Sequence, residues 1–211
     1  MERQCRLCNI LNGSITGKEN QLIAESNEYF SLASIGALVE GWVLVIPKKH
    51  VISMKELYIE KGFINFTNYM IRLIKSQYSS SFIIFEHGPN KCDSNTSCGT
   101  DHAHLHILPY QNSLYIDMLD TGLKWGECTT SQISSIVGSD EYLFYSEISS
   151  NSEWEDPKGF IHVLAQPVSQ YFRRLIANQI NRANEYDYKK YSHKGVAIET
   201  NNVLSRAIGY R

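Results

Sequence analysis

Three histidines, His102, His104 and His106, alternate with apolar residues near the middle of this 211-residue sequence. Side chains of a strand alternate between its faces, so the imidazoles would share one face at a spacing of about 6–7 Å. A row of titratable rings is a costly cover for an ordinary surface, although a solvated strand or an adventitious metal patch is the alternative. The internal position and the regular alternation exclude an expression tag. The pattern therefore favours a functional site.

Imidazoles suit chemistry at phosphorus. A histidine is nucleophilic near neutral pH when a hydrogen-bond acceptor holds its other ring nitrogen. The N–P bond that forms is labile, so the group can pass on to water or to another acceptor. Neighbouring imidazoles can donate to phosphate oxygens or protonate a leaving group. The three histidines thus predict transfer of a phosphoryl-type group.

The segment that begins at His102 resembles the histidine triad signature, in which three histidines alternate with apolar residues and two more apolar residues follow. Residues 38–50, which end in Pro-Lys-Lys-His, are similar to a second landmark of that superfamily. The resemblance covers about residues 5–110 and implies a sheet-based α+β fold. It implies attack on the α-phosphorus of a nucleotide derivative by His104, through a nucleotidyl-histidine intermediate. It also implies that His106 orients the nucleophile and stabilises the phosphate.

A cysteine pair near the N-terminus, Cys5-x-x-Cys8, has the spacing of a metal site. A structural zinc needs four ligands, and His50 and His102 are the natural completion. Superfamily members with an N-terminal Cys-x-x-Cys, including enzymes similar to galactose-1-phosphate uridylyltransferase, resemble this arrangement. The expected zinc is structural and closed, and it would pin the N-terminal segment to the triad strand. Free thiols on a short turn are the alternative.

Two further cysteines, Cys92 and Cys98, are rival ligands because they flank the loop that enters the triad strand. Their gap is wider than that of the usual zinc knuckle. The N-terminal pair is therefore the preferred one.

The same loop offers candidate phosphate ligands. Gly88 and Gly99 permit close backbone approach, and Ser or Asn side chains of this loop contact phosphate in the family. Gly99 stands where several relatives carry a hydroxyl, so Ser97 and Thr100 are the candidates. His87, at the end of the preceding strand, is interpreted with equal weight as a structural or as a catalytic histidine.

A second candidate anion site lies in residues 166–174, where a helix over 169–181 is predicted with Ser169 as its N-cap. A helix N-terminus favours anions, and arginines one turn later add positive charge. Gln170 and Arg173 are therefore candidate nucleotide-binding residues. The stretch resembles one found in larger bacterial histidine triad proteins. An amphipathic helix with a solvated basic edge is the alternative.

The elements that must position these residues follow from periodicity and turn signals. A long amphipathic helix is predicted from about 53 to 79, broken near Gly62. This order predicts an α+β fold, with an antiparallel sheet of about five strands and a long helix, plus a C-terminal α/β extension. The tail from Asp187 onward shows no reliable period. The predicted strands are 21–25, 28–33, 42–47, 81–86 and 102–108, followed in the second half by 142–148 and 160–165.

Two domains are expected. Residues 1–112 would form the histidine triad domain, and residues 113–211 an extension packed on or near the active site. A weak boundary lies between about 112 and 130, where Gly, Ser and Thr accumulate. Many members of the family are symmetric dimers, so a homodimer is one expected assembly, unless the extension replaces or modifies that interface.

Composition limits the function classes. The net charge of −2 argues against a general nucleic-acid coat and against a basic membrane-surface protein. The strongest apolar run, 42–46, is too short to cross a bilayer, and residues 1–4 lack the apolar run of a secretory signal. With five cysteines and no such signal, a reducing, cytoplasmic compartment is expected.

These features together predict a nucleotide phosphohydrolase that cleaves at the α-phosphate through an intermediate on His104. A nucleotidyltransferase or phosphorylase using the same intermediate is the first alternative, and a non-catalytic nucleotide-binding module is the second. A histidine in the third triad position, His106, resembles the hydrolase branches, whereas the cysteine pair resembles the uridylyltransferases. The expected partner is a nucleotide or nucleotide derivative, with neither a membrane nor general nucleic acid.

Overall fold

The structure is a computed structural model that describes residues 5–78, 81–149 and 152–209. Two expectations from the sequence concern other positions. Residues 1–4, in which no secretory signal is expected, and residue 79, the expected end of the long helix, lie outside the described residues.

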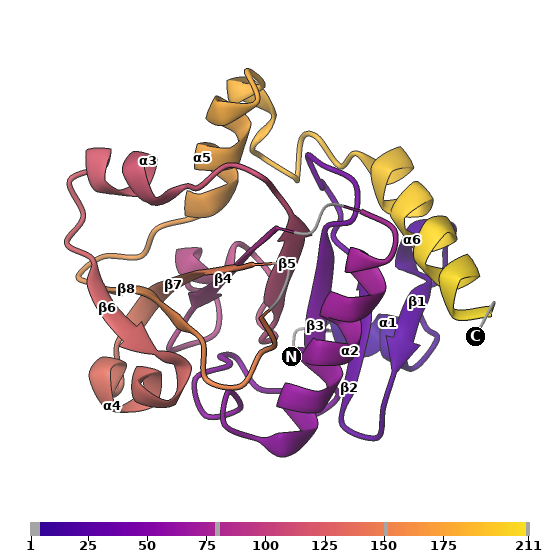
Figure 1. Cartoon of the computed structure of the whole chain (residues 1–211), viewed down its shortest axis with the longest axis horizontal. Helices are drawn as coiled ribbons and strands as arrows, with labels where there is room; N and C mark the ends of the chain where they lie inside the picture. The colour runs from indigo at the N-terminus through magenta and orange to yellow at the C-terminus, as the bar shows by residue number, and fades with distance from the viewer. Residues whose placement is uncertain (1–4, 79–80, 150–151, 210–211) are drawn as a thin grey trace.

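Eight strands form one sheet in the part of the chain that the structure describes, and every neighbouring pair is antiparallel (Figure 1). The spatial order is β1-β2-β3-β5-β4-β7-β8-β6. The predicted α+β class with an antiparallel sheet is confirmed. The sheet is larger than the expected five strands because strands of the second half continue it beyond β4. The strands are β1 (Leu22–Glu25), β2 (Tyr29–Ala33), β3 (Val43–Pro47), β4 (Phe82–Gly88), β5 (Leu105–Pro109), β6 (Gly126–Thr129), β7 (Glu141–Ile148) and β8 (Lys158–Leu164).

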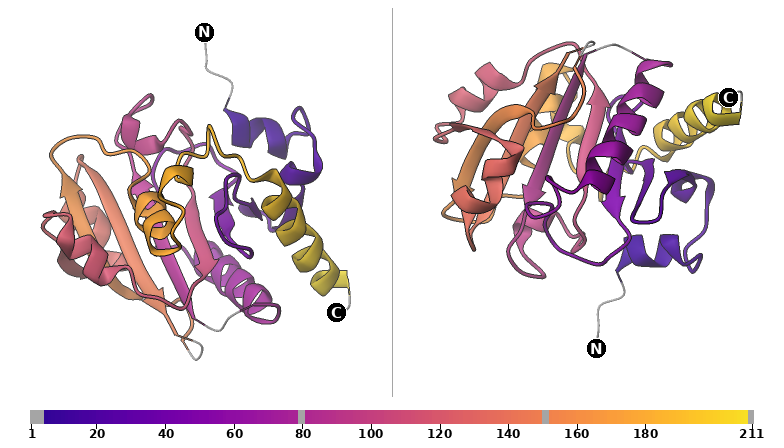
Figure 2. Two further views of the ribbon diagram at one scale, coloured as in Figure 1. Left: turned by 90° about the horizontal axis from the view of Figure 1, so that it is seen from above. Right: turned by 60° about the horizontal axis from the view of Figure 1, so that its bottom comes forward.

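Helices cover both faces of this sheet, with α2 and α5 on opposite sides (Figure 2). Under α2 lies a core that takes Leu105 and Ile107 from β5, both fully buried. The other face forms a second core under α5, and a smaller one under α1 next to it. The α-helices are α1 (Arg6–Leu11), α2 (Lys61–Lys75), α3 (Tyr115–Asp120), α4 (Ile133–Val137), α5 (Tyr171–Gln179) and α6 (Lys194–Gly209), and short 3-10 turns occupy Lys18–Asn20, Asn95–Ser97, Thr130–Gln132 and Ala183–Glu185.

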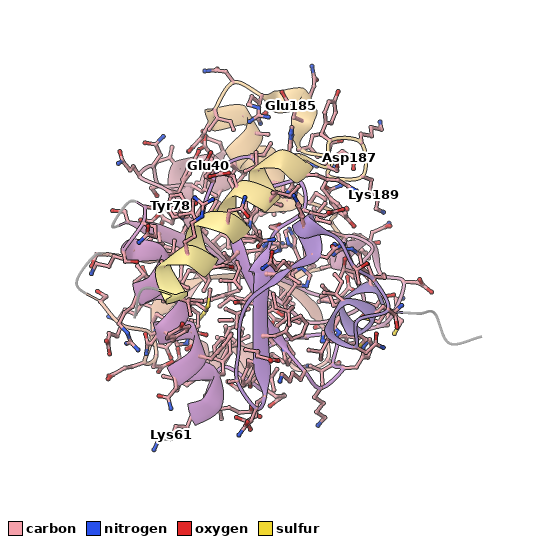
Figure 3. All side chains as sticks on the ribbon, turned by 90° about the vertical axis from the view of Figure 1, so that its right-hand side faces the viewer. Glu40, Lys61, Tyr78, Glu185, Asp187 and Lys189 are labelled. Carbon is pink, nitrogen blue, oxygen red and sulfur yellow. The ribbon has the colours of Figure 1, made fainter. Side chains whose placement is uncertain are left out.

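The helix α6 was not predicted from the sequence. Figure 3 looks onto this helix and labels Glu185, Asp187 and Lys189 in the segment that leads into it. Polar contacts fix it to the sheet, since Ala33 N donates to Asn201 Oδ1 at 3.2 Å. None of the described helices has the length and apolar character needed to cross a membrane.

The predicted helix from about 53 is wrong in its first third. Residues 53–60 form successive tight turns, with Leu57 N donating to Met54 O and Glu60 N donating to Leu57 O. Such turns repeat every three residues, so their buried positions follow nearly the same spacing as those of a helix. Helix α2 then begins at Lys61, next to the break expected at Gly62.

The predicted N-cap of the second-half helix also shifts. Helix α5 is capped by Gln170, whose φ of 54° is left-handed, and no side chain caps the helix. Gln170 N donates instead to the Cys98 thiol at 3.1 Å, so the chain turns sharply before the helix and Ser169 lies outside it. The contact to a distant loop therefore overrides the local capping preference.

Buried polar contacts hold the turn segment that follows His50. Glu86, only 1% exposed, accepts from Met54 N at 2.7 Å and from the hydroxyls of Tyr58 and Tyr142 at 2.5 Å each. Burial raises the pKa of the Glu86 carboxyl, and these hydrogen bonds oppose the rise. The turn segment is thus tied to β4 through one carboxyl group.

We expect Tyr58→Phe to lower the free energy of unfolding by about 1–3 kcal/mol, because a buried acceptor loses one of its donors. Chemical denaturation followed by fluorescence measures the change. Tyr191→Phe is the matched control, since Tyr191 is 40% exposed, and it should change stability by less than about 0.5 kcal/mol. Equal effects of the two substitutions would contradict the anchoring role of Glu86.

Candidate metal site and active site

The pairing of β3 with β5 brings two distant histidines together. The strands are antiparallel, with Val45 opposite Leu105. The C-terminal end of β3 therefore lies beside the N-terminal end of β5. His50 follows β3, and His102 precedes β5. Their ring centroids are 4.9 Å apart.

Helix α1 brings the cysteine pair to the same place. Cys5 is the N-cap of this helix, and its sulfur accepts from Cys8 N, so the two thiols flank the first turn. Leu7 and Ile10 on the buried side of α1 pack on β2 and β3. The Cys-x-x-Cys spacing thus places both thiols toward the histidines, while the residues between and after them anchor the helix.

Four possible ligand atoms converge, one each from Cys5, Cys8, His50 and His102, and all lie within 4.8 Å of one another. The Nδ1 atom of His102 is 3.3 Å from Cys5 Sγ and 3.4 Å from Cys8 Sγ. The Nδ1 atom of His50 is 3.4 Å from Cys8 Sγ. These are the four ligands that the sequence predicts, and the structure brings them together as a group able to hold a metal ion.

The remaining nitrogen of His102 is also engaged. Its Nε2 lies 2.8 Å from the carbonyl oxygen of Pro47, which makes Nε2–H the donor and leaves Nδ1 free to bind a metal. Burial, with repulsion from His50 and His104, lowers the pKa of His102 to about 4, against the Pro47 hydrogen bond. A neutral imidazole with a fixed tautomer is the form that ligates a metal.

The thiols show why a cation suits this group. Burial and the neighbouring Cys5 raise the pKa of Cys8 to about 11. Two adjacent thiols resist ionising together unless a cation offsets their charge, as zinc does in Cys₂His₂ sites. The rival cysteines are placed otherwise: Cys92 is exposed, and Cys98 accepts from Gln170 N.

The strand expected over 102–108 begins later, at Leu105. Pro47 has no N–H to offer a longer ladder with β3. Ala103 N donates instead to Val51 O at 2.7 Å, outside the sheet. Only His106 of the three histidines therefore lies within a strand, although the expected alternation of core and site residues holds, because Ala103 is 2% exposed beneath α2.

The ring of His104 is held by its own neighbour. Its Nδ1 is 2.7 Å from the carbonyl oxygen of His102, so Nδ1–H donates and the lone pair remains on Nε2. Burial, together with Arg6, lowers the pKa of His104, while the carbonyl contact opposes the shift. The side chain is half-buried. A neutral imidazole with a fixed lone pair is chemically a nucleophile or a base.

His106 has the opposite tautomer. Trp42, the residue before β3, donates its indole N–H to His106 Nδ1 at 3.0 Å, which places the imidazole proton on Nε2. Phe85 stacks on the ring at 4.4 Å between centroids. Burial holds the pKa of His106 well below its ordinary value, with His104, His87 and Arg173 adding repulsion. His106 is therefore a neutral hydrogen-bond donor 4.8 Å from the ring of His104.

The loop candidates are engaged within the protein. Ser97 Oγ donates to Ser94 O at 2.8 Å. Thr100 hydrogen-bonds to Tyr188, whose pKa is raised by burial against the effect of this contact. Gln170 accepts from Tyr188 N through its side-chain oxygen. These contacts join the loop before β5 to the segment before α6. Phosphate binding by Ser97, Thr100 and Gln170 stays a prediction.

Arg173 extends from α5 towards the histidines. It is 4% exposed, donates to the carbonyl oxygens of Tyr186 and Gly36, and lies 5.0 Å from the centre of the Trp42 ring. Burial lowers its pKa to about 10, against the attraction of nearby acidic groups. Arg173 lies against the Trp42 ring, and Trp42 in turn donates to His106. A role of Arg173 in nucleotide binding stays a prediction.

Sequence reasoning missed Trp42 and the carbonyl of Pro47. A signal for Trp42 existed, because an indole N–H at the head of an aliphatic strand needs an acceptor once it is buried. No sequence pattern indicates that the Pro47 carbonyl is the acceptor for His102, because this contact depends on how the segment after β3 meets the segment before β5.

A cavity of about 630 Å³ lies elsewhere, over β6 and β8. It is lined partly by Ser113, Glu147 and Phe160. Two of its polar side chains are paired with each other, since Ser113 Oγ donates to Glu147. The histidine cluster, with its fixed tautomers, is the better candidate for chemistry.

Solved structures similar to this chain include histidine triad proteins. One from Clostridium difficile is 26% identical, with 54% of this chain and 96% of that chain covered and a TM-score of 0.40. A hypothetical histidine triad nucleotide-binding protein from Sulfolobus tokodaii is 15% identical over 97% of both chains, with a TM-score of 0.38. A uridylyltransferase is 10% identical, with 89% of this chain and 88% of that chain covered and a TM-score of 0.44. No family model and no curated protein matches the sequence. With TM-scores below 0.5, these similarities assign no chemistry to this chain.

We expect Trp42→Phe to weaken the tautomer preference of His106 roughly fivefold, because one buried hydrogen bond contributes about 1 kcal/mol. Nitrogen-15 NMR of the imidazoles measures the proton position directly. Trp154→Phe is the matched control, since Trp154 is an equally buried indole on the opposite face. An unchanged His106 spectrum in Trp42→Phe would contradict the assignment.

Proposed function

We propose that this chain is a histidine triad enzyme that attacks the α-phosphorus of a nucleotide derivative with Nε2 of His104. The observation that carries the proposal is the contact of His104 Nδ1 with the His102 carbonyl, which leaves the Nε2 lone pair free. The neighbouring His106 carries its proton on Nε2, the reverse arrangement. One nitrogen that attacks and one N–H that donates are the two functions that phosphoryl chemistry requires.

The reaction follows from these tautomers. The Nε2 lone pair of His104 forms a bond to phosphorus as the bond to the leaving group breaks, and the leaving group keeps that electron pair. His106 Nε2–H donates to a non-bridging oxygen, whose negative charge grows as the new bond forms. Water then attacks the phosphorus, the N–P bond breaks, and a nucleoside monophosphate is released. A phosphate or sugar-phosphate acceptor in place of water would make the enzyme a transferase.

Hydrolysis is the proposed outcome. It is supported by His106 in the third triad position, which resembles the hydrolase branches of the superfamily. The substrate class is a nucleotide or nucleotide derivative. The positive charge of Arg173, buried 5.0 Å from the Trp42 ring, favours an anion in this region.

We further propose that the four-residue metal group holds a structural zinc. The donor set, two thiols and two imidazole Nδ1 atoms, fits the tetrahedral Cys₂His₂ sites that zinc prefers. When bound, zinc would neutralise the thiolates and clamp α1 to the residues just before β5. His102 supplies one of these donors, so the clamp would also fix the carbonyl that holds His104.

A covalent adduct tests the enzymatic proposal. The protein is incubated with a panel of nucleotides, dinucleoside polyphosphates and nucleotide sugars, quenched without acid, and read by peptide mass spectrometry. We expect a nucleoside monophosphate on the peptide that contains His104, and loss of the nucleophile in His104→Ala should lower turnover by at least about 10³-fold. His162→Ala is the control, because His162 lies on β8. Nucleotide binding without adduct or turnover would identify a binding module and overturn the proposal.

Metal analysis tests the zinc site. We expect about one zinc per chain in protein purified without chelators, and a sharp loss in Cys5→Ser, because one of four ligands is removed. Cys92→Ser is the matched control, since that thiol is exposed and outside the cluster. Zinc retained in Cys5→Ser at the level of the control would show that the site is wrong.

A further inference from the structure

A fourth histidine lies beside the triad. His87 is near the end of β4, and the β4–β5 register pairs Phe85 with His106. The paired residues end there, and the same register continued by two residues would bring His87 level with His104, which lies just before β5. Residues opposite each other on neighbouring strands project from the same face, with Cβ atoms about 4.5–5.5 Å apart. His87 therefore shares the face on which His106 lies.

Ring contacts confirm this placement. The His87 ring centroid is 6.3 Å from that of His106, 5.8 Å from that of Phe85 and 5.3 Å from that of Phe172 on α5. The imidazole is thus enclosed by two aromatic rings and one triad histidine.

One nitrogen of His87 stands out. Its Nε2 is buried and has no hydrogen-bond partner among the described residues. A buried polar atom that is left without a hydrogen-bond partner destabilises the fold. By contrast, a nitrogen of each of His102, His104 and His106 is fixed by a protein group. A packing role alone would be served better by an apolar ring, so the unpaired nitrogen points to a ligand.

We infer that Nε2–H of His87 donates a hydrogen bond to a non-bridging oxygen of the phosphate that His104 attacks. The inference rests on the proposed function, since it concerns the same phosphate. His87 would thereby become a further catalytic residue, opposite His106. Two neutral N–H donors, one from β4 and one from β5, would then hold two oxygens of the phosphate.

The charge state agrees with a donor rather than a proton carrier. Burial, with His104 and Arg173 adding repulsion, lowers the pKa of His87 to about 3. The groups that face the ring are His104 just before β5, His106 from β5 and Arg173 from α5. The pKa values of the two histidines are themselves shifted towards the neutral form. A neutral imidazole stabilises a growing oxyanion through its N–H without transferring the proton.

Two substitutions distinguish the contribution of the N–H donor of His87 from that of its aromatic ring. His87→Phe keeps an aromatic ring and removes both nitrogens, whereas His87→Gln retains an N–H near the position of Nε2. His162→Phe is the matched control. Leu143 of β7 pairs with His87 on one side and with His162 of β8 on the other. His162 is therefore in register with His87, but two strands further from His104. Thermal unfolding confirms that each variant is folded.

The readouts are the rate of adduct formation on His104 and the calorimetric affinity for AMP, GMP, CMP and UMP. We expect His87→Phe to slow adduct formation by about 10²-fold and His87→Gln to recover about tenfold of this. The shape of the pH profile between about 5 and 8 should not change, because a neutral donor does not titrate there. Weaker binding of the monophosphates to His87→Phe is the readout that needs no turnover.

The inference is overturned if His87→Phe behaves as His162→Phe does, if His87→Gln is no better than His87→Phe, or if one limb of the pH profile disappears. The two proposals fail separately. Wild-type protein without an adduct refutes the nucleophile, and the calorimetry then still tests His87 as a phosphate ligand. A normal adduct in His87→Phe refutes only the role of His87.

Discussion

The site depends on the contacts of one residue, His102. Its Nδ1 faces the two thiols, its Nε2 donates to Pro47, and its carbonyl oxygen accepts from His104 Nδ1. The ring and the carbonyl belong to the same residue, and both are held by hydrogen bonds. A displacement of the metal group therefore moves the acceptor that sets the tautomer of the next histidine. The position of His102 in the metal group and the tautomer of His104 are therefore coupled by geometry.

Opposite tautomers explain why neighbouring histidines differ in chemistry. A backbone carbonyl can only accept, so it places the proton of His104 on Nδ1. An indole can only donate, so Trp42 places the proton of His106 on Nε2. Burial, with added repulsion from neighbouring positive groups, lowers the pKa of both rings and favours their neutral form. The choice of acceptor or donor next to each ring thus leaves a free lone pair on His104 and a free N–H on His106.

Much of this could be predicted from sequence, and the remainder has physical causes. The alternation around His104 and the Cys-x-x-Cys spacing are local patterns, so they identified the sheet and the four members of the metal group. The start of β5 at Leu105 was not predicted, because it depends on Pro47 in the partner strand β3. Helix α6 was not predicted because its buried side includes the polar residues Thr200 and Asn201, which weaken the apolar period. Asn201 accepts from Ala33 N of β2, and Thr200 accepts from Gly41 N before β3.

The second half of the chain belongs to the site through the sheet itself. Strand β7 pairs with β4 along its whole length, so the strand that carries His87 is interior, with β5 on one side and β7 on the other. At His87 itself the pairing is with Leu143 of β7, and this fixes the backbone that carries the ring. From the same half, α5 encloses His87 with Phe172 and covers Trp42 with Arg173. Residues beyond about 112 therefore determine how rigidly both proposed phosphate donors, His106 and His87, are held.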